Sequence, residues 1–242
     1  MILFHFTGCN VYAYCCGVGG IVSICTMAMI ARERYSAISR DMLPFQMKES
    51  PGVKKPVTIL MLVWIFASVM LAPPLFGWSR YVVDGHGTSC TFDYVSQTAS
   101  NRNFYLFLFI CGFSFPLFVT VYYYMRLVFH VKSHDRQLGS QQCQSLQRYP
   151  IRRQHWRRRE MKLCRSCALV VITFVIAWTP YAVVALLSIF GVQGHLTPLT
   201  SLIPGLFAKA CVIHNPIIYS LTHPRFKTAL LSVLKIHCSW YK

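Results

Sequence analysis

The sequence predicts an all-α membrane protein, and two observations carry this prediction. Hydrophobic residues make up 55% of the 242-residue chain and charged residues only 13%, whereas an ordinary soluble domain carries about 25% charged residues. The apolar residues also gather in five runs, each long enough to cross a bilayer, which takes about 20 residues. We therefore expect five transmembrane helices in a single domain over residues 1–242.

The expected helices follow one another with links of different lengths. They cover about residues 5–38, 56–77, 102–131, 157–190 and 197–221, and a short amphipathic helix follows over about 223–236. Several of these spans contain proline, which removes a backbone donor and bends a helix. Membrane helices tolerate such bends where neighbours satisfy the carbonyl groups left unpaired. The prolines thus predict a bundle of kinked helices around an internal cavity.

The positive charges indicate how the chain is oriented. The formal net charge is +17, but the basic residues alternate with apolar runs, so we expect membrane lipid and not nucleic acid as a partner. Segments 32–55 and 126–165 and the tail are rich in Lys and Arg, whereas the link 78–103 carries only Arg80 and Arg102. The positive-inside rule places the basic segments, and with them the C-terminus, in the cytoplasm.

One ionisable residue stands inside the last apolar run. Lys209 lies near the middle of residues 202–219. A cation at mid-bilayer costs roughly 2.5–3.5 kcal/mol, so such a residue is by default a candidate functional site. The alternative is a lysine that snorkels to the membrane surface or faces a water-filled cavity.

The cysteines suggest a covalent link and no metal site. None of the 11 cysteines forms the paired spacing of a zinc site. Cys9 precedes Arg34 by 25 residues, about 37 Å along a helix, so one helix places Cys9 at the outer face and Arg34 at the inner face. Cys90 lies in the outer link, on the oxidising side. A Cys9–Cys90 disulfide and two separate thiols are both compatible with this arrangement.

An ion pair at the inner helix ends is a second hypothesis. Arg34 ends the first span and Glu160 precedes the fourth, so a bond between them would tie two helices together. A surface ion pair contributes only about 0–1 kcal/mol, which biases a two-state switch without locking it. The alternative is an arginine that snorkels.

Three motifs together resemble the rhodopsin class of G-protein-coupled receptors. They are Glu33-Arg34-Tyr35, Ala177-Trp178-Thr179-Pro180-Tyr181 and Asn215-Pro216-Ile217-Ile218-Tyr219. Lys209 lies seven residues before Pro216, which narrows the resemblance to the opsins, where this lysine holds retinal as a Schiff base. The link from Gly77 to Tyr94 resembles the opsin retinal plug. The resemblance covers essentially the whole chain, but only helices three to seven of the seven-helix family.

The resemblance implies a role for each matching residue. The retinal site is Lys209 as the attachment point, Asp84 as the counterion, and Tyr12, Gly20, Trp178 and Tyr181 around them; Cys9 and Cys90 form the disulfide; and the switch that couples to a G protein comprises Glu33, Arg34, Tyr35, Glu160, Tyr124, Asn215, Pro216 and Tyr219. Asp93 is expected to pair with Arg80 and fix the strands of the plug. Cys238 is a candidate for palmitoylation.

The implied function is light sensing and not catalysis. Covalently bound 11-cis-retinal is expected to isomerise in light and activate a heterotrimeric G protein in the plasma membrane of a photoreceptor cell, with arrestin as a further partner. His223-Pro224-Arg225 resembles the signature of invertebrate visual opsins and melanopsins and favours Gq, with Gs as the alternative. A retinal photoisomerase and a truncated, non-signalling fragment are the competing hypotheses. The intact switch motifs favour signalling over isomerase activity.

Overall fold

The computed structural model describes residues 6–41, 54–83, 87, 89–141, 151–191, 197–222 and 232. For some helix ends, residues 151–160 among them, only the backbone is described. The elements are α1 (Phe6–Asp41), α2 (Lys54–Leu71), η2 (Pro73–Phe76), β1 (Tyr81–Val83), β2 (Cys90–Phe92), α3 (Ala99–Phe107), η3 (Leu108–Ser114), α4 (Phe115–Gln141), α5 (Ile151–Ile189) and α6 (Pro198–Thr222). The predicted all-α class is confirmed. The predicted amphipathic helix 223–236 and Cys238 lie outside the described residues.

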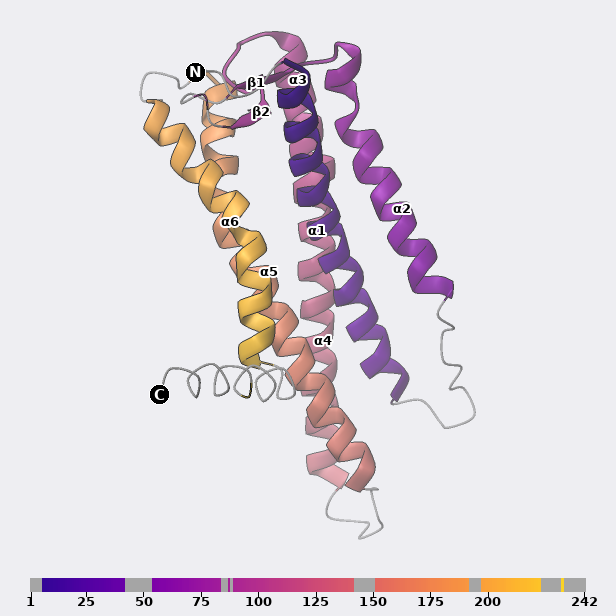
Figure 1. Ribbon diagram of the computed structural model, residues 1–242. Coiled ribbons are helices and arrows are strands. Elements are labelled where there is room, and N and C mark those ends of the chain that lie inside the picture. Colours follow the sequence, from indigo (N-terminus) through magenta and orange to yellow (C-terminus); the bar gives the residue numbers. More distant parts are fainter. Residues whose placement is uncertain are drawn as a thin grey trace.

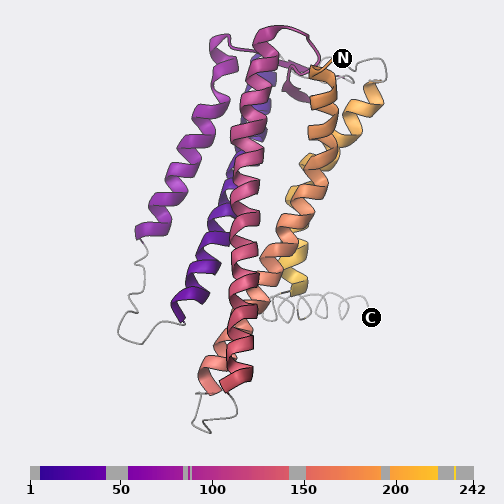
Figure 2. The same cartoon turned by 180° about the vertical axis from the view of Figure 1, so that it is seen from behind.

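The long helices form a bundle with one small hairpin at its end. Figure 1 shows β1 and β2 at the end where α1 begins, and Figure 2 shows the same bundle from behind. α1 is central: it packs on α2, α4 and α5, while α5 packs along α6. We call the end of the bundle opposite the hairpin the far end; there α1 and α4 end and α5 begins (Figure 1).

Apart from α6, the long described helices have the length and composition of membrane spans. Four segments qualify, namely Thr7–Ser39, Pro56–Phe76, Ala99–Val131 and Cys164–Ile189, and a shorter apolar segment, Leu202–Cys211, lies in α6. Their outward faces are also apolar, as on α2, where Met61 is 60% exposed and Ile65 59% exposed. An apolar exterior is what a helix bundle needs when lipid is its solvent. The chain is a multi-pass membrane protein.

Small and branched side chains of α1 build the core on two sides. Toward α2 and α3, Val18 and Ile21 pack with Ala67, Leu71 and Phe104. Toward α5 and α6, Ile24 and Met27 of α1 pack with Val170, Phe174, Ala177 and Cys211. The space that matters for function lies between these two clusters.

A wide helical turn interrupts the helix that α3 and α4 share. Residues Leu108–Ser114 form a π-helix, in which the N–H of Phe115 donates to the carbonyl of Ile110 five residues earlier. Pro116 follows directly and has no N–H to continue the α-helical pattern. The prolines predicted bends in general, but not this turn. Single π turns inside α-helices are frequent at functional sites, and this one faces the cavity described below.

The hairpin is held by one covalent bond and one ion pair. β1 pairs antiparallel with β2, so Tyr81 lies opposite Phe92 and Val83 opposite Cys90. A disulfide joins Cys9 of α1 to Cys90 of β2, which confirms the predicted pairing. The predicted pair of Arg80 with Asp93 is also present, with Nε 2.7 Å from Oδ2.

The carboxylate of Asp93 is the polar centre of this loop. Asp93 is only 3% exposed, and its Oδ1 accepts the backbone N–H of Ser96 at 2.9 Å. Burial raises the pKa of this carboxyl, but the hydrogen bonds from Ser96 and the guanidinium of Arg80 lower it more, so the pKa of Asp93 lies below its usual range. These contacts join the residues on either side of the hairpin to each other.

Candidate functional site

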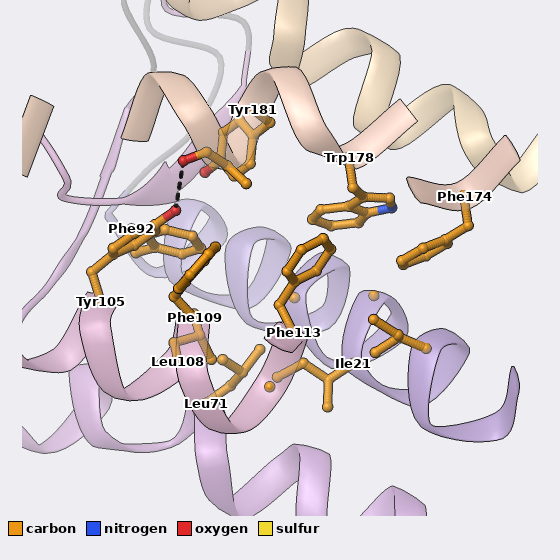
Figure 3. Close-up of a pocket in the computed structure, with 15 residues that line it drawn as sticks. Ile21, Leu71, Phe92, Tyr105, Leu108, Phe109, Phe113, Phe174, Trp178 and Tyr181 are labelled. Atoms are coloured by element: carbon orange, nitrogen blue, oxygen red, sulfur yellow. Dashed lines mark hydrogen bonds between the residues drawn. The ribbon is translucent and has the colours of Figure 1, made fainter. Parts of the chain in front are cut away.

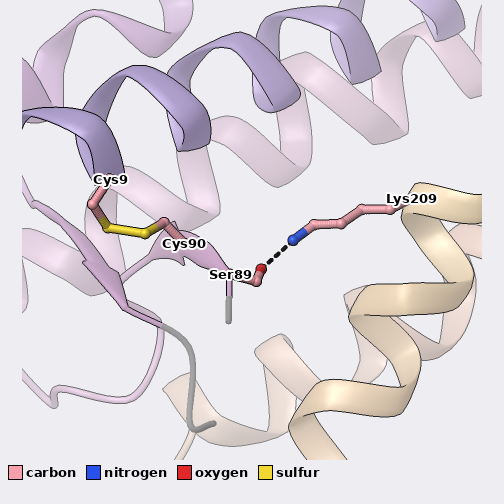
Figure 4. The surroundings of a disulfide bond; sticks show 4 residues. All are labelled: Cys9, Ser89, Cys90 and Lys209. Carbon is pink, nitrogen blue, oxygen red and sulfur yellow. Dashed lines mark hydrogen bonds between the residues drawn. A yellow bond between two sulfur atoms is a disulfide. The ribbon is translucent and has the colours of Figure 1, made fainter. Parts of the chain in front are cut away.

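The amine of Lys209 points from α6 toward the hairpin. Nζ donates a hydrogen bond to Oγ of Ser89, the residue before the disulfide-bonded Cys90 (Figure 4). Nζ also lies 5.1 Å from the ring centroid of Tyr12 on α1, which is the geometry of a cation–π contact. Three elements thus converge on one amine, and the disulfide fixes two of them to each other.

Lys209 lines a cavity of about 320 Å³ between α1, the hairpin, α5 and α6. The wall on α1 is made of small residues, including Ala13, Cys16, Gly17 and Gly20, which leave the space open. The predicted site residues Gly20, Trp178 and Tyr181 all line this cavity together with Lys209. The structure therefore brings these four residues together around one cavity.

A second, apolar cavity of about 90 Å³ adjoins the first one. The two cavities share five lining residues, namely Gly17, Gly20, Phe92, Trp178 and Tyr181. Figure 3 shows aromatic side chains from α3, the π turn, β2 and α5 facing each other around this second cavity. The site is thus elongated, with an amine at one end and an aromatic chamber at the other.

The indole of Trp178 is fixed on several sides. Its Nε1 donates to Sγ of Cys211 on α6 at 3.3 Å, and its ring stacks on Phe174 at a centroid distance of 5.5 Å. A Cβ placed on Gly20 would lie 2.9 Å from Cη2 of the indole. Gly20 is therefore required for the close approach of Trp178 to α1.

Tyr181 connects α5 to the hairpin. Its hydroxyl lies 2.6 Å from Oγ1 of Thr91 on β2, and its ring makes edge contacts with Phe92, Tyr94 and Trp178. Tyr181 follows Pro180, the proline inside α5. The hairpin therefore touches α5 at the point where proline weakens the helix.

The aromatic chamber uses the π turn. Tyr105 stacks on Phe109 at 6.2 Å, and Phe109 stacks on Phe113 at 5.8 Å. The hydroxyl of Tyr105 donates to the carbonyl of Ala182 at 3.3 Å, which ties the chamber to α5 (Figure 3). Phe109 and Phe113 are four residues apart, so they lie on one face of the helix, and both line the cavity together with Gly112.

No carboxylate lines either cavity among the described residues. The predicted counterion, Asp84, lies outside the described part of the chain. Asp93 is engaged with Arg80 and Ser96. The assignment of Asp84 therefore stays a prediction.

The predicted switch residues lie at the far end of the bundle. Glu33 is exposed, and Tyr35 accepts a hydrogen bond from Nη2 of Arg126 at 3.2 Å. The hydroxyl of Tyr124 is buried in the same region. For the remaining members, Glu160, Asn215, Pro216 and Tyr219, the side chains lie outside the described atoms, so the Arg34–Glu160 pair is untested.

Several site residues were missed by the sequence reasoning. They are Ser89, Thr91, Phe92, Phe109, Phe113 and Cys211. Ser89, Thr91 and Phe92 could have been found, because residues next to a cysteine that is bonded to a helix must lie against the bundle. The residues of the π turn carried no such signal.

Comparisons with known proteins agree with this geometry. The sequence model of the 7 transmembrane receptor (rhodopsin family) matches residues 2–219. The chain belongs to this family, which is a family of receptors and not of enzymes.

Individual relatives are melanopsins and rhodopsins. Melanopsin of Rattus norvegicus is 37% identical over 230 residues, which cover 94% of this chain and 47% of the relative. The Gq-coupled rhodopsin of Mizuhopecten yessoensis is 34% identical over 223 residues, which cover 92% of this chain and 44% of the relative. The crystal structure of squid rhodopsin superposes with a TM-score of 0.85 at 34% identity, covering 94% of this chain and 61% of that one. The chain thus spans about half the length of the curated relatives that it matches.

Proposed function

We propose that this chain forms the light-receiving part of a G-protein-coupled photoreceptor, with retinal held covalently on Lys209. The observation that supports this proposal is the elongated site, in which one amine stands at the end of an otherwise apolar space. Such a space suits a long apolar molecule that ends in an aldehyde, because an amine can condense with the aldehyde carbon, with the aldehyde oxygen leaving as water, while aromatic rings pack on the remainder.

The residues around Lys209 hold its amine in a defined direction. The hydroxyl of Ser89 accepts a hydrogen bond from Nζ, and the ring of Tyr12 makes a cation–π contact with it. The disulfide-bonded hairpin covers the cavity and limits water, which protects a covalent link from hydrolysis. Asp84, in the same loop, is proposed to supply the negative charge that a cation in this site requires.

Bound retinal supplies absorption of visible light and a change of shape from the 11-cis to the all-trans form. The protein responds through Trp178, which touches both cavities and both α1 and α6. A displaced indole pushes on α5 two residues before Pro180, where the helix bends most easily. A ligand that fits one state better than the other shifts the population by that difference.

The far end of α5 is proposed to move in response. Movement there breaks the Arg34–Glu160 latch and opens a cytoplasmic cleft for a heterotrimeric G protein. The basic links support this orientation, with the C-terminus on the cytoplasmic side of the plasma membrane. Gq is the proposed subtype, supported by His223-Pro224-Arg225 and by the Gq-coupled relative, and arrestin is a further proposed partner.

The first experiment measures absorbance after incubation of the expressed chain with 11-cis-retinal. Two forms are compared. One is this chain, and the other, the joined form, carries at its N-terminus the part of the Mizuhopecten yessoensis rhodopsin that precedes the region matched by this chain. A visible band is expected that Lys209→Ala abolishes and that Lys162→Ala, a lysine exposed on α5, leaves intact. A band that persists in Lys209→Ala, or no band in either form, refutes the proposal.

Signalling is tested separately from binding. Light-dependent nucleotide exchange on Gq is measured together with the retinal isomer extracted before and after illumination. A receptor shows light-dependent exchange. Release of 11-cis-retinal without nucleotide exchange supports a photoisomerase. If both forms show the absorbance band but only the joined form supports exchange, this chain alone is a non-signalling segment.

A further inference from the structure

The far end of the bundle is closed by a small apolar cluster. Ile38 of α1, Leu127 of α4 and Cys164 of α5 are 2%, 2% and 4% exposed, and they pack together. The partly buried residues around them are Tyr35, Tyr124, Val131 and Met161. In the proposed receptor the cleft for the G protein opens where α1, α4 and α5 separate, so these three side chains form its gate.

Arg126 stands beside this gate on α4, next to Leu127. Its Nη2 donates to the hydroxyl of Tyr35 at 3.2 Å, and its Cζ lies 5.7 Å from the ring centroid of Tyr35 and 5.8 Å from that of Tyr122. An arginine that only snorkels to the membrane surface would not need these three contacts. Arg126 thus joins α4 to the motif Glu33-Arg34-Tyr35 on α1.

Tyr35 receives further contacts from the same helix. Its ring lies 5.9 Å from that of Tyr123 and 6.2 Å from that of His130. All of these partners come from α4, so they fix the register between α1 and α4. Ile38 lies one turn beyond Tyr35, and Leu127 directly follows Arg126. That register therefore positions Ile38 and Leu127, and the two side chains form the contact surface, here called the seat, on which Cys164 of α5 packs.

We propose that Arg126 is a positioning residue that holds Tyr35 on α4 and so keeps the gate of Ile38, Leu127 and Cys164 closed. The role as a gate rests on the proposed receptor function, whereas the closure itself is a property of the fold. This device uses no carboxylate and is therefore independent of the Arg34–Glu160 latch. Loss of the contact weakens the seat, so α5 leaves it more often and exposes the thiol of Cys164.

The test measures how fast maleimide reacts with Cys164 in membranes, in the dark and without retinal. A Cys167→Ser background and mass spectrometry assign the label to Cys164. Arg126→Ala is expected to raise the labelling rate about tenfold, because it removes one hydrogen bond and two cation–π contacts of an exposed side chain. Arg126→Lys keeps a donor and a cation and is expected to restore much of the protection.

Tyr35→Phe removes only the hydroxyl and provides a second variant that keeps the ring packing. It is expected to raise the rate about two- to threefold, because the cation–π contact remains. Arg126→Ala combined with Tyr35→Phe is expected to label no faster than Arg126→Ala alone. Arg102→Ala, which removes an exposed arginine of α3 far from Cys164, is the control and is expected to change nothing.

Two results would overturn the proposal. One is a labelling rate in Arg126→Ala and Tyr35→Phe that equals the rate in Arg102→Ala. The other is full additivity of the two substitutions. Since neither retinal nor light is used, this outcome is independent of whether Lys209 binds a chromophore. If the gate role also holds, Arg126→Ala raises light-independent nucleotide exchange in the joined form.

Discussion

Gly20 is the position where one added methyl group should disturb the site most clearly. In Gly20→Ala the new Cβ lies 2.9 Å from Cη2 and 3.1 Å from Cζ2 of Trp178. Ordinary contacts of this kind begin near 3.4 Å, so the indole has to move. It has little freedom, because it is stacked on Phe174 and bonded to Cys211.

The expected cost follows from this confinement. Inserting a methyl group into a packed core typically costs about 1–3 kcal/mol. For a chain of this size each kcal/mol lowers the melting temperature by about 2–4 °C, so a cost of about 2 kcal/mol lowers it by roughly 4–8 °C. Replacing glycine in a helix also contributes up to about 1 kcal/mol in the opposite direction, which a control has to remove.

Gly19→Ala is that control. It lies on the same helix, and nothing lies within 4 Å of its added Cβ. It gains the helix propensity without the contact, so the difference between the two variants isolates the clash. Thermal unfolding of both variants in detergent is the assay. In the background Trp178→Phe, which removes the two indole carbons, Gly20→Ala should cost nothing further.

Equal melting temperatures for Gly20→Ala and Gly19→Ala would refute this reasoning. So would a loss in Gly20→Ala that persists unchanged when Trp178 is replaced by Phe. In either case the close approach of the indole to α1 would not be a determinant of the packing around the site.

Three further predictions concern the hairpin. The pKa of Asp93 is lowered in the folded protein, so its pair with Arg80 stabilises the loop fully at any pH above about 3.9, the pKa of an unfolded aspartate. This stabilisation is lost as the pH falls through the folded pKa, so the free energy of unfolding should depend less on pH in this acid range in Asp93→Asn. Cys9→Ser removes the disulfide and should lower the free energy of unfolding by about 2–5 kcal/mol; chemical denaturation measures this, and an unchanged midpoint would contradict it. Thr91→Val should cost about 1 kcal/mol relative to Thr91→Ser, which keeps the hydroxyl near Tyr181, and equal melting temperatures would exclude a contribution from this bond.

The sequence was informative wherever a signal is local or carried by a motif. Apolar runs predicted the membrane class, and the structure confirms an all-α bundle. The motifs and the offset of Lys209 from Pro216 predicted an opsin-like receptor, and the chain belongs to the rhodopsin family. The two predicted pairs in the hairpin, Cys9–Cys90 and Arg80–Asp93, are present.

The partners of Lys209 could not be read from the chain. Ser89 and Lys209 are 120 residues apart, and Tyr12 lies on a third element. Hydrophobic periodicity shows which face of a helix is buried, but not which residue of another element faces it. The predictions for Asp84 and Glu160 depend on the same kind of long-range contact and stay predictions.

Lys209 illustrates which properties of the site follow from the sequence and which follow only from the tertiary structure. The sequence determined that an amine lies within an apolar helix and that a family motif surrounds it, because composition and spacing are properties of the chain. Only the tertiary structure decided that this amine ends an elongated pair of cavities, and that Arg126 fastens α1 to α4 beside the gate at the far end. Both depend on how the helices pack, since a cavity or a contact between helices exists only once their side chains meet.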